Sequence, residues 1–402
     1  MKQNKRTYCN SVKKLVIQLL TRRFFREFDY ILLFTVLAIS VLSTVAIYST
    51  TINRSGMEDW YQKQLIWEII SFVCMIAFAI LDYRILRGFL SWIGYGICLI
   101  LLVCVFFYPA KNGAQCWITL PGGMQFQPSE LTKIFVILTI SRYMTKAKQK
   151  NESFGFKHFF VIFMINIIPF LLILKQPHLG QALTLVGITG AMMVLFLSRK
   201  QLVYYTLIVA AGLTVIILAK TVFTEQSIEF VDKLPFLNHQ KERIVTFLDP
   251  EIEKMGASYQ VTQAKLAIGS GQLVGRGIIN GTATQGNWVP EQWTDFIFSA
   301  IGEELGFLGG SVLLTLFFVF LYRLTVIAGQ TNDFFSTSFI TGVIGMFTFQ
   351  IVENVGMNLA MMPVTGITLP FVSYGGTSLL TNFVIVGMVL SMKHRSKELF
   401  FD

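Results

Sequence analysis

Apolar residues run along this chain in long blocks that recur from one end to the other. Each block has about 20 residues and almost no charge, which is the length a helix needs to cross the hydrocarbon core of a bilayer. The blocks predict ten membrane-spanning helices, at residues 30–50, 64–81, 88–107, 129–144, 158–174, 180–198, 202–220, 296–322, 336–356 and 374–392.

Composition agrees with this prediction. The 402 residues are 53% hydrophobic and only 14% charged, and they include 37 Phe. The alternative is a large soluble helical protein with buried core helices, but that class rarely repeats such uncharged blocks. The sequence therefore predicts an all-α polytopic membrane protein.

The positions of Lys and Arg predict the orientation. They concentrate before residue 28, in 142–157 and in the final ten residues, whereas the short loops on the other side carry few. Positive residues favour the cytoplasmic side, so both termini are expected inside. The net charge of +10 then reflects this bias and attraction to anionic lipid, and no nucleic-acid partner is expected.

The chain divides into three parts on this basis. Residues 1–29 form a basic cytoplasmic segment, 30–392 form the membrane domain, and 393–402 form a cytoplasmic tail. Within the first part, VKKLVIQLLTRRFF (12–25) is either an amphipathic helix on the membrane surface or a disordered tail. Residues 221–294 form one large extracellular loop between predicted helices 7 and 8, too long for a simple connector.

Three further outward-facing stretches are richer in Gly, Pro and polar residues than connectors need. They are residues 113–135, 174–183 and 357–382, on the same side as the large loop. Together with that loop, they are expected to line one cavity that opens to the outside.

Glu130 and Lys133 lie three residues apart at the start of a predicted span and therefore share a helix face. Either they form a local ion pair that neutralises two costly charges, or they face a cavity. Gln127–Pro128–Ser129 resembles a helix start, with Ser129 as the capping candidate.

Asp295, Glu303 and Glu304 stand in or beside the apolar run of the eighth predicted span. Asp295 is either a helix cap or a functional carboxylate, because Thr and Asp are common helix starters. For Glu303 and Glu304 we expect an architectural role, in packing near Gly306, Gly309 and Gly310.

Several long, co-linear motifs carry a family resemblance. WTDFIFSAIGEELGFLG, QPSELTK, YQVTQAKLAIGSG and PVTGITLPFVSYGGTSLLTN resemble the SEDS family (shape, elongation, division and sporulation) over about residues 28–395. The stretches NGTATQGNWVPEQWTDFIF and GMNLAMMPVTGI are closest to its elongation-type branch.

The resemblance implies a peptidoglycan glycosyltransferase of the bacterial cytoplasmic membrane. It would polymerise lipid II at the outer face of that membrane, beside a class B penicillin-binding protein. The essential acid of the family falls on Asp295, the candidate general base on the acceptor hydroxyl. A divalent cation (Mg²⁺ or Mn²⁺, ligands unknown) or Lys/Arg would stabilise the leaving diphosphate. Lipid II and the nascent glycan strand are expected to contact Glu130, Lys133, Gln127, Ser129, Gln176, His178, Cys116, Ser373, Tyr374 and Gly375.

Two positions depart from the family pattern. Cys116 stands where the family usually has Arg, and His178 stands where it usually has Asp. The first change removes a planar guanidinium that can bind phosphate through two N–H groups. The second replaces a carboxylate by a neutral or cationic imidazole ring. The changes run in opposite charge directions, so they either compensate each other, if the positions are close, or weaken the activity.

Two other classes of function fit parts of the sequence. A lipid II flippase or transporter also has many helices and intramembrane charges, but its charges and broken helices should lie nearer mid-membrane. A non-catalytic scaffold for a penicillin-binding protein would tolerate Asp295→Asn, whereas a polymerase would not.

Overall fold

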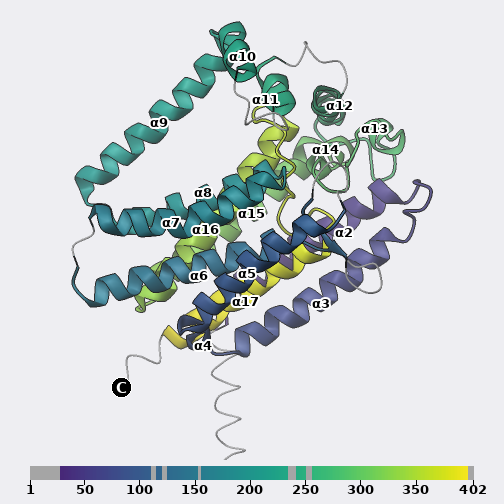
Figure 1. The fold of residues 1–402 in the computed structure, drawn as a ribbon. Helices are drawn as coiled ribbons and strands as arrows, with labels where there is room; N and C mark the ends of the chain where they lie inside the picture. Colours follow the sequence, from purple (N-terminus) through teal and green to yellow (C-terminus); the bar gives the residue numbers. More distant parts are fainter. Residues whose placement is uncertain are drawn as a thin grey trace, which may run out of the picture.

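A bundle of long helices carries a group of short helices at one end (Figure 1). The computed structural model describes residues 28–109, 115–119, 125–152, 155–233, 241–249 and 256–396. The predicted segment 12–25 and the end of the predicted tail lie outside these residues. The long helices are α2 (Tyr30–Thr51), α3 (Trp60–Ile80), α5 (Leu90–Cys104), α6 (Pro128–Gln149), α7 (Phe156–Lys175), α8 (Leu179–Met193), α9 (Arg199–Thr221), α15 (Gly306–Gln330), α16 (Phe334–Asn358) and α17 (Gly376–Ser396).

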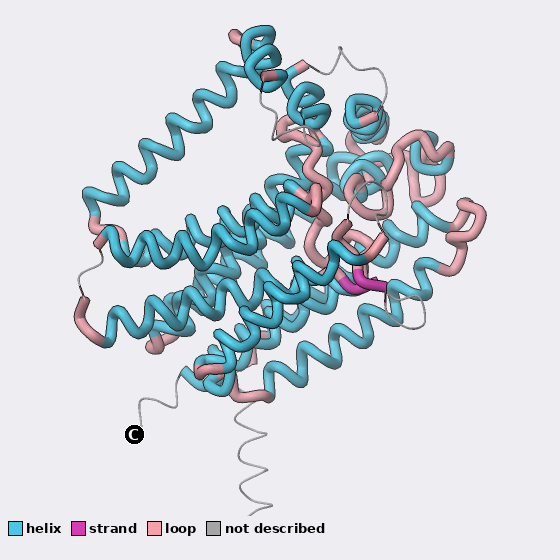
Figure 2. The backbone as a smooth tube through the Cα atoms, viewed as in Figure 1, coloured by secondary structure: helices cyan, strands magenta, loops and turns pink. Residues whose placement is uncertain are grey.

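The shorter elements gather mainly at one end of this bundle, together with most of the longer loops (Figure 2). The helices there are α10 (Thr224–Asp232), α11 (Lys241–Leu248), α12 (Ala257–Ser270), α13 (Thr282–Gln285) and α14 (Ile297–Glu304). An antiparallel strand pair, β1 (Ile118–Thr119) and β2 (Gln125–Phe126), lies among the loops, with Ile118 opposite Phe126. The turns α4 (Arg84–Arg87), η1 (Val105–Phe107) and η2 (Val194–Phe196) complete the elements.

Nine helices in the described part of the chain are long and apolar enough to cross a membrane. Every predicted span except 129–144 overlaps one of them, although 296–322 does so only from Gly306 onward. That span falls in α6, a 22-residue helix that packs against α5, α8 and α16 but carries Glu130, Lys133 and a basic last turn. These charges lower its hydropathy, and the two within the bundle, Glu130 and Lys133, are fully buried away from lipid.

The predicted span 296–322 is wrong as one continuous helix, because the chain breaks at Leu305 into α14 and α15. Gly306 has φ +67°, and a Cβ there would collide with the backbone of Leu273 and Gly275. Residues 272–277 run across the break and form hydrogen bonds with the backbone groups there. For example, the Phe307 N–H donates to the Gln272 carbonyl at 2.8 Å. A long-range crossing of this kind leaves no periodic signal in the sequence.

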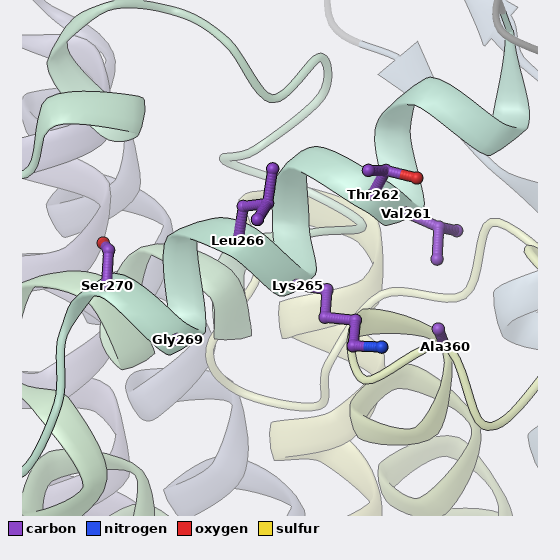
Figure 3. Close-up of a pocket in the computed structure, with 7 residues that line it drawn as sticks. All are labelled: Val261, Thr262, Lys265, Leu266, Gly269, Ser270 and Ala360. Carbon is purple, nitrogen blue, oxygen red and sulfur yellow. The ribbon is translucent and has the colours of Figure 1, made fainter.

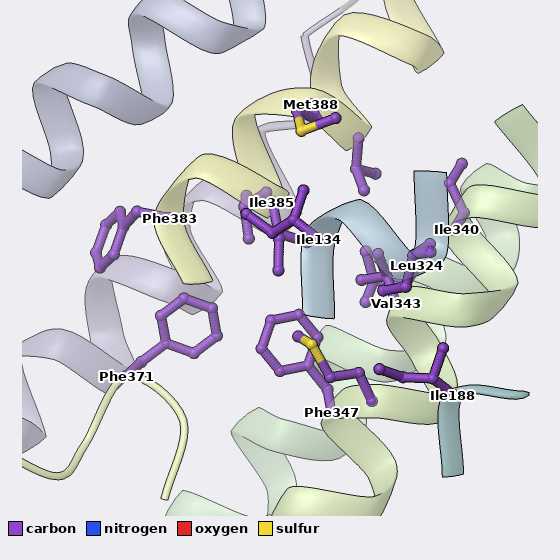
Figure 4. Packing of buried hydrophobic residues seen from close by; sticks show 14 of the residues in the cluster. Ile134, Ile188, Leu324, Ile340, Val343, Phe347, Phe371, Phe383, Ile385 and Met388 are labelled. Carbon is purple, nitrogen blue, oxygen red and sulfur yellow. The ribbon is translucent and has the colours of Figure 1, made fainter. Parts of the chain in front are cut away.

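The loop between α16 and α17 folds back into the core. Its Phe371 stacks on Phe347 of α16, with ring centroids 5.4 Å apart, and meets Phe320 and Phe383 edge-on. Figure 4 shows Phe371 among the labelled aromatic and aliphatic side chains of the bundle. Buried aromatic contacts of this kind anchor a non-helical segment inside a helical core.

Candidate active site around Asp295

Asp295 lies in the turn that precedes α14, and its backbone is held by α16. Its N–H donates to the Glu291 carbonyl at 3.1 Å, and its own carbonyl accepts from Asn354 Nδ2 at 2.8 Å and Asn358 Nδ2 at 3.2 Å. The cap position of α14 is Phe296, without a side-chain capping bond. The capping alternative for Asp295 is therefore wrong, and its carboxylate is not used to start the helix.

The loop between α16 and α17 is tied to the same turn. The Ser373 hydroxyl donates to the Thr294 carbonyl at 2.5 Å and accepts from Leu369 N–H at 2.8 Å, while Tyr374 N–H donates to the Trp293 carbonyl at 2.9 Å. Ser373 is therefore engaged by the backbone on both sides. The structure gives this predicted substrate contact a positioning role, because its hydroxyl holds the loop against the Asp295 turn.

Tyr374 and Gly375 lie at the edge of this region. The Tyr374 ring stacks on Trp60 with a centroid separation of 4.7 Å, and Gly375 directly precedes α17. A Cβ on Gly375 would meet only Ser378, at 3.8 Å. The backbone at Gly375 is therefore open to close approach by another molecule.

Gly366 of the same loop lies between the Asp295 carboxylate and the Arg243 guanidinium. A Cβ on Gly366 would stand 3.4 Å from Asp295 Oδ2 and 3.6 Å from Arg243 Nη1, and the residue has φ +72°. Burial, followed by the charge of Glu291, raises the pKa of the half-buried Asp295 to about 7, while Arg243 acts to lower it. A carboxylate with this pKa suits general base catalysis at neutral pH.

Arg243 is the site residue that the sequence did not single out. It comes from α11, in the stretch RIVTFLDP of the large loop. Arg243 lies about fifty residues before Asp295 in the sequence, and no local sequence pattern links these two residues. A strongly basic side chain in a Gly- and Pro-flanked loop was the only available signal.

Glu130 and Lys133 form the expected ion pair, with both side chains fully buried and Lys133 Nζ 2.8 Å from Glu130 Oε2. Gln181 Nε2 of α8 donates to Glu130 Oε1 at 2.6 Å. The capping role of Ser129 is wrong: the cap position is Gln127, and Ser129 Oγ is buried without a hydrogen-bond partner. Gln127 Nε2 is unpartnered as well. Buried polar atoms left in this state favour a site that a polar ligand or water completes.

The stretch around Gln176 joins three elements. Gln176 Nε2 at the end of α7 donates to the Leu102 carbonyl at 2.8 Å, which makes it a structural contact rather than an exposed one. The first turn of α8 touches the loop between α16 and α17, because a Cβ on Gly180 would collide with Ile367. These contacts place His178, between the two helices, beside the candidate site.

The two departures from the family pattern meet the same charged groups. His178 is half-buried, and burial, Arg243 and Lys133 lower the pKa of its ring to about 4, so it is neutral at pH 7. Burial and the Asp295 charge raise the pKa of the buried Cys116 thiol to about 12. His178 is thus near Arg243 and Cys116 is near Asp295, while compensation between the two substitutions stays a hypothesis.

Glu303 and Glu304 are occupied within the structure. Glu303 accepts hydrogen bonds from the backbone N–H groups of Ala283 and Thr284 at 2.8 Å, and Glu304 accepts from Ser49 Oγ at 2.5 Å. The role is architectural, as expected, because the two carboxylates hold the neighbouring helices α13 and α2.

The divalent cation has no evident protein cage. Among the described residues, no group of three or more His, Cys, Asp or Glu side chains is placed to hold a metal. Asp295 and Glu291 are two carboxylates at one place, which is fewer ligands than a dedicated site uses.

Comparison with known proteins identifies the family of this chain. A family model described as "Cell cycle protein", covering FtsW, RodA and SpoVE, matches residues 28–398. The peptidoglycan glycosyltransferase MrdB of Escherichia coli (strain K12) is 34% identical over 379 residues, covering 92% of this chain and 95% of MrdB. The peptidoglycan glycosyltransferase RodA of Treponema pallidum (strain Nichols) is 29% identical over 436 residues, covering 92% and 98%.

A solved structure shares the fold. A chain in a peptidoglycan synthase complex, solved to show the structural coordination of polymerization and crosslinking, superimposes with a TM-score of 0.71 at 26% identity. The match covers 93% of this chain and 99% of that one. Family model, relatives and fold agree over nearly the whole length: the chain belongs to the FtsW/RodA/SpoVE family of cell cycle proteins.

Proposed function

We propose that this protein is a peptidoglycan glycosyltransferase of the elongation type, which polymerises lipid II at the outer face of the cytoplasmic membrane. The observation that carries the proposal is the Asp295 carboxylate, half-buried with a pKa of about 7 and facing Arg243 across Gly366. The curated names of the relatives support the same activity. The proposal includes ten spans, with both termini in the cytoplasm and the 221–294 segment outside, so that this site would lie at the outer membrane interface.

The reaction joins two lipid-linked sugars. Asp295 accepts the proton of the acceptor 4-hydroxyl as its oxygen attacks the anomeric carbon of the donor. The bond from that carbon to the diphosphate breaks, and the lipid diphosphate leaves with the bonding electrons. Because attack and departure occur on opposite faces, an α-linked donor gives a β-1,4 bond. One carboxylate suffices, in contrast to the pair that glycoside hydrolysis commonly uses.

The leaving diphosphate needs positive charge rather than a proton. Arg243 supplies a planar guanidinium beside Asp295. Fixed cations aimed at developing negative charge lower the barrier without reorganising during the reaction. Arg243 in this role takes over the function of the arginine that Cys116 replaces. A divalent cation on the substrate diphosphate and a class B penicillin-binding protein as partner complete the proposal.

The test is polymerisation of labelled lipid II by the purified chain with a class B penicillin-binding protein and Mg²⁺ or Mn²⁺. Glycan ladders are expected from the wild type and none from Asp295→Asn, a loss of at least about 100-fold. The matched control is Asp232→Asn, an exposed aspartate of α10 that pairs with Lys241 and should remain active.

The Asn variant should fold. Burial raises the pKa of Asp295, so its ionised form is disfavoured in the folded protein, and an amide of the same shape should be at least as stable at pH 8. A folded Asp295→Asn chain that still makes ladders would end the general base assignment. Absence of ladders from both chains in an intact complex would favour the scaffold instead.

A further inference from the structure

Two ammonium groups from different helices converge on Ala360, in the loop after α16. Lys220 Nζ, near the end of α9, donates to the Ala360 carbonyl at 3.0 Å and lies 4.1 Å from the ring centroid of Phe247. Lys265 of α12 points toward Ala360 (Figure 3), and its charge acts on Lys220. Ala360 has φ +61°, a left-handed conformation that non-glycine residues adopt mainly at functional sites.

Lys265 lines an open pocket of about 610 Å³ on α12, which we call the α12 pocket. Most of its surface is apolar, with Val261, Leu266 and Ala360 among the lining residues. None of the described residues that line it is acidic. Its chemistry is therefore that of an amphiphile's site, with an apolar wall and a cationic group at one side.

A smaller pocket adjoins the α12 pocket. The two share Val261 and Ala360, and the smaller one also contains Lys220 and Phe247. On α11, Phe247 is four residues after Arg243, so both lie on one helix face. Arg243, whose charge acts on Asp295, thus lies one helical turn from the Phe247 ring that Lys220 contacts.

The proposed reaction needs two diphosphate positions. The donor's diphosphate is attached to the reacting carbon and must lie beside Asp295. The acceptor reacts through the hydroxyl of its outer sugar, so its own diphosphate must lie two sugar rings away, where its lipid chain can reach the membrane. The α12 pocket meets these requirements, because α9 beside it is an apolar helix with no buried residue in its length.

We propose that the α12 pocket, with Lys220 and Lys265, binds the diphosphate and the first prenyl units of the acceptor lipid. This inference rests on the proposed function. Lysine binds phosphate as a compact point charge, and two such groups facing one apolar wall match a prenyl diphosphate better than an uncharged lipid or a free sugar.

The test uses a farnesyl diphosphate with a photoreactive diazirine on its prenyl chain, and the full chain in lipid nanodiscs. After illumination, mass spectrometry quantifies adducts on the peptide that contains α12. Lys220→Gln/Lys265→Gln should reduce these adducts at least about tenfold. The control Lys233→Gln, an exposed lysine of α10 paired with Glu229, should label like the wild type.

Several results would overturn the inference. The first is labelling of α12 in the double Gln variant equal to that in the wild type. The second is labelling by the corresponding prenyl alcohol equal to that by the diphosphate probe. The third is displacement of the probe by equimolar phosphatidylglycerol, which would make the pocket a general anionic-lipid site. Lys220→Arg/Lys265→Arg keeps both charges and must keep the labelling. Asp295→Asn should label normally, so loss of the general base and loss of this site are separate outcomes.

Discussion

The charges around Asp295 make the pH dependence of polymerisation a sharp test of its role. Asp295 must be ionised to accept a proton, so activity should rise with pH and level off above the pKa of about 7. Glu291 raises this pKa and Arg243 lowers it. Glu291→Gln should therefore move the acid limb of the profile to lower pH, and Arg243→Gln should move it to higher pH.

The size of the effect follows from the charge removed. Loss of one neighbouring charge shifts a carboxyl pKa by about one unit. A change from about 7 to about 6 raises the ionised fraction at pH 6 from roughly 9% to roughly 50%, so Glu291→Gln should be about fivefold more active there and nearly unchanged at pH 8. The amide of Gln keeps an oxygen to accept the hydrogen bond that Thr294 Oγ1 gives Glu291 at 3.3 Å.

The assay is the initial rate of lipid II polymerisation at subsaturating substrate between pH 5 and 9. Arg243→Gln should also lower the rate at every pH, because the same guanidinium faces the leaving diphosphate. For this variant, only the position of the acid limb of the pH–rate profile therefore reports on the pKa of Asp295. Glu229→Gln, on the exposed face of α10, is the matched carboxylate control and should leave the profile unchanged. If the acid limbs of the wild type and of all three variants coincide, titration of Asp295 does not cause the loss of activity at low pH.

Three further predictions concern neighbouring groups. Lys133→Met should lower the free energy of unfolding by about 3–5 kcal/mol, since it strands a buried carboxylate, and adding Glu130→Gln should recover most of the loss in thermal unfolding without restoring polymerisation. Gly366→Ala should cost about 1–2 kcal/mol of stability for its left-handed backbone and lower kcat/KM about ten- to hundredfold, because the methyl group would stand 3.4 Å from Asp295 Oδ2; wild-type rates would contradict the close approach. Cys116→Arg should move the acid limb about one unit lower, because a guanidinium there favours the ionised carboxylate, and an unmoved limb would separate Cys116 from the site.

Local sequence determined the helical framework of this protein. A bilayer core imposes a length of about 20 apolar residues on every span, so each span can be recognised without knowing its neighbours. Nine predicted spans overlap apolar helices, and the tenth overlaps α6. The pairing of Glu130 with Lys133 was also local, because residues three apart on a helix share a face. Asp295 was identified by motif resemblance, not by periodicity.

Only the tertiary structure decided what surrounds Asp295. Arg243 reaches it from α11, Asn354 and Asn358 hold its carbonyl from α16, and Gly366 keeps the space between the two charges open. The break before α15 likewise depends on a distant segment that crosses it. These contacts join residues far apart in the chain, and side-chain shape and backbone hydrogen bonding select them. Hydrophobic periodicity records which face of a helix is buried, but it does not record which distant group is buried against it.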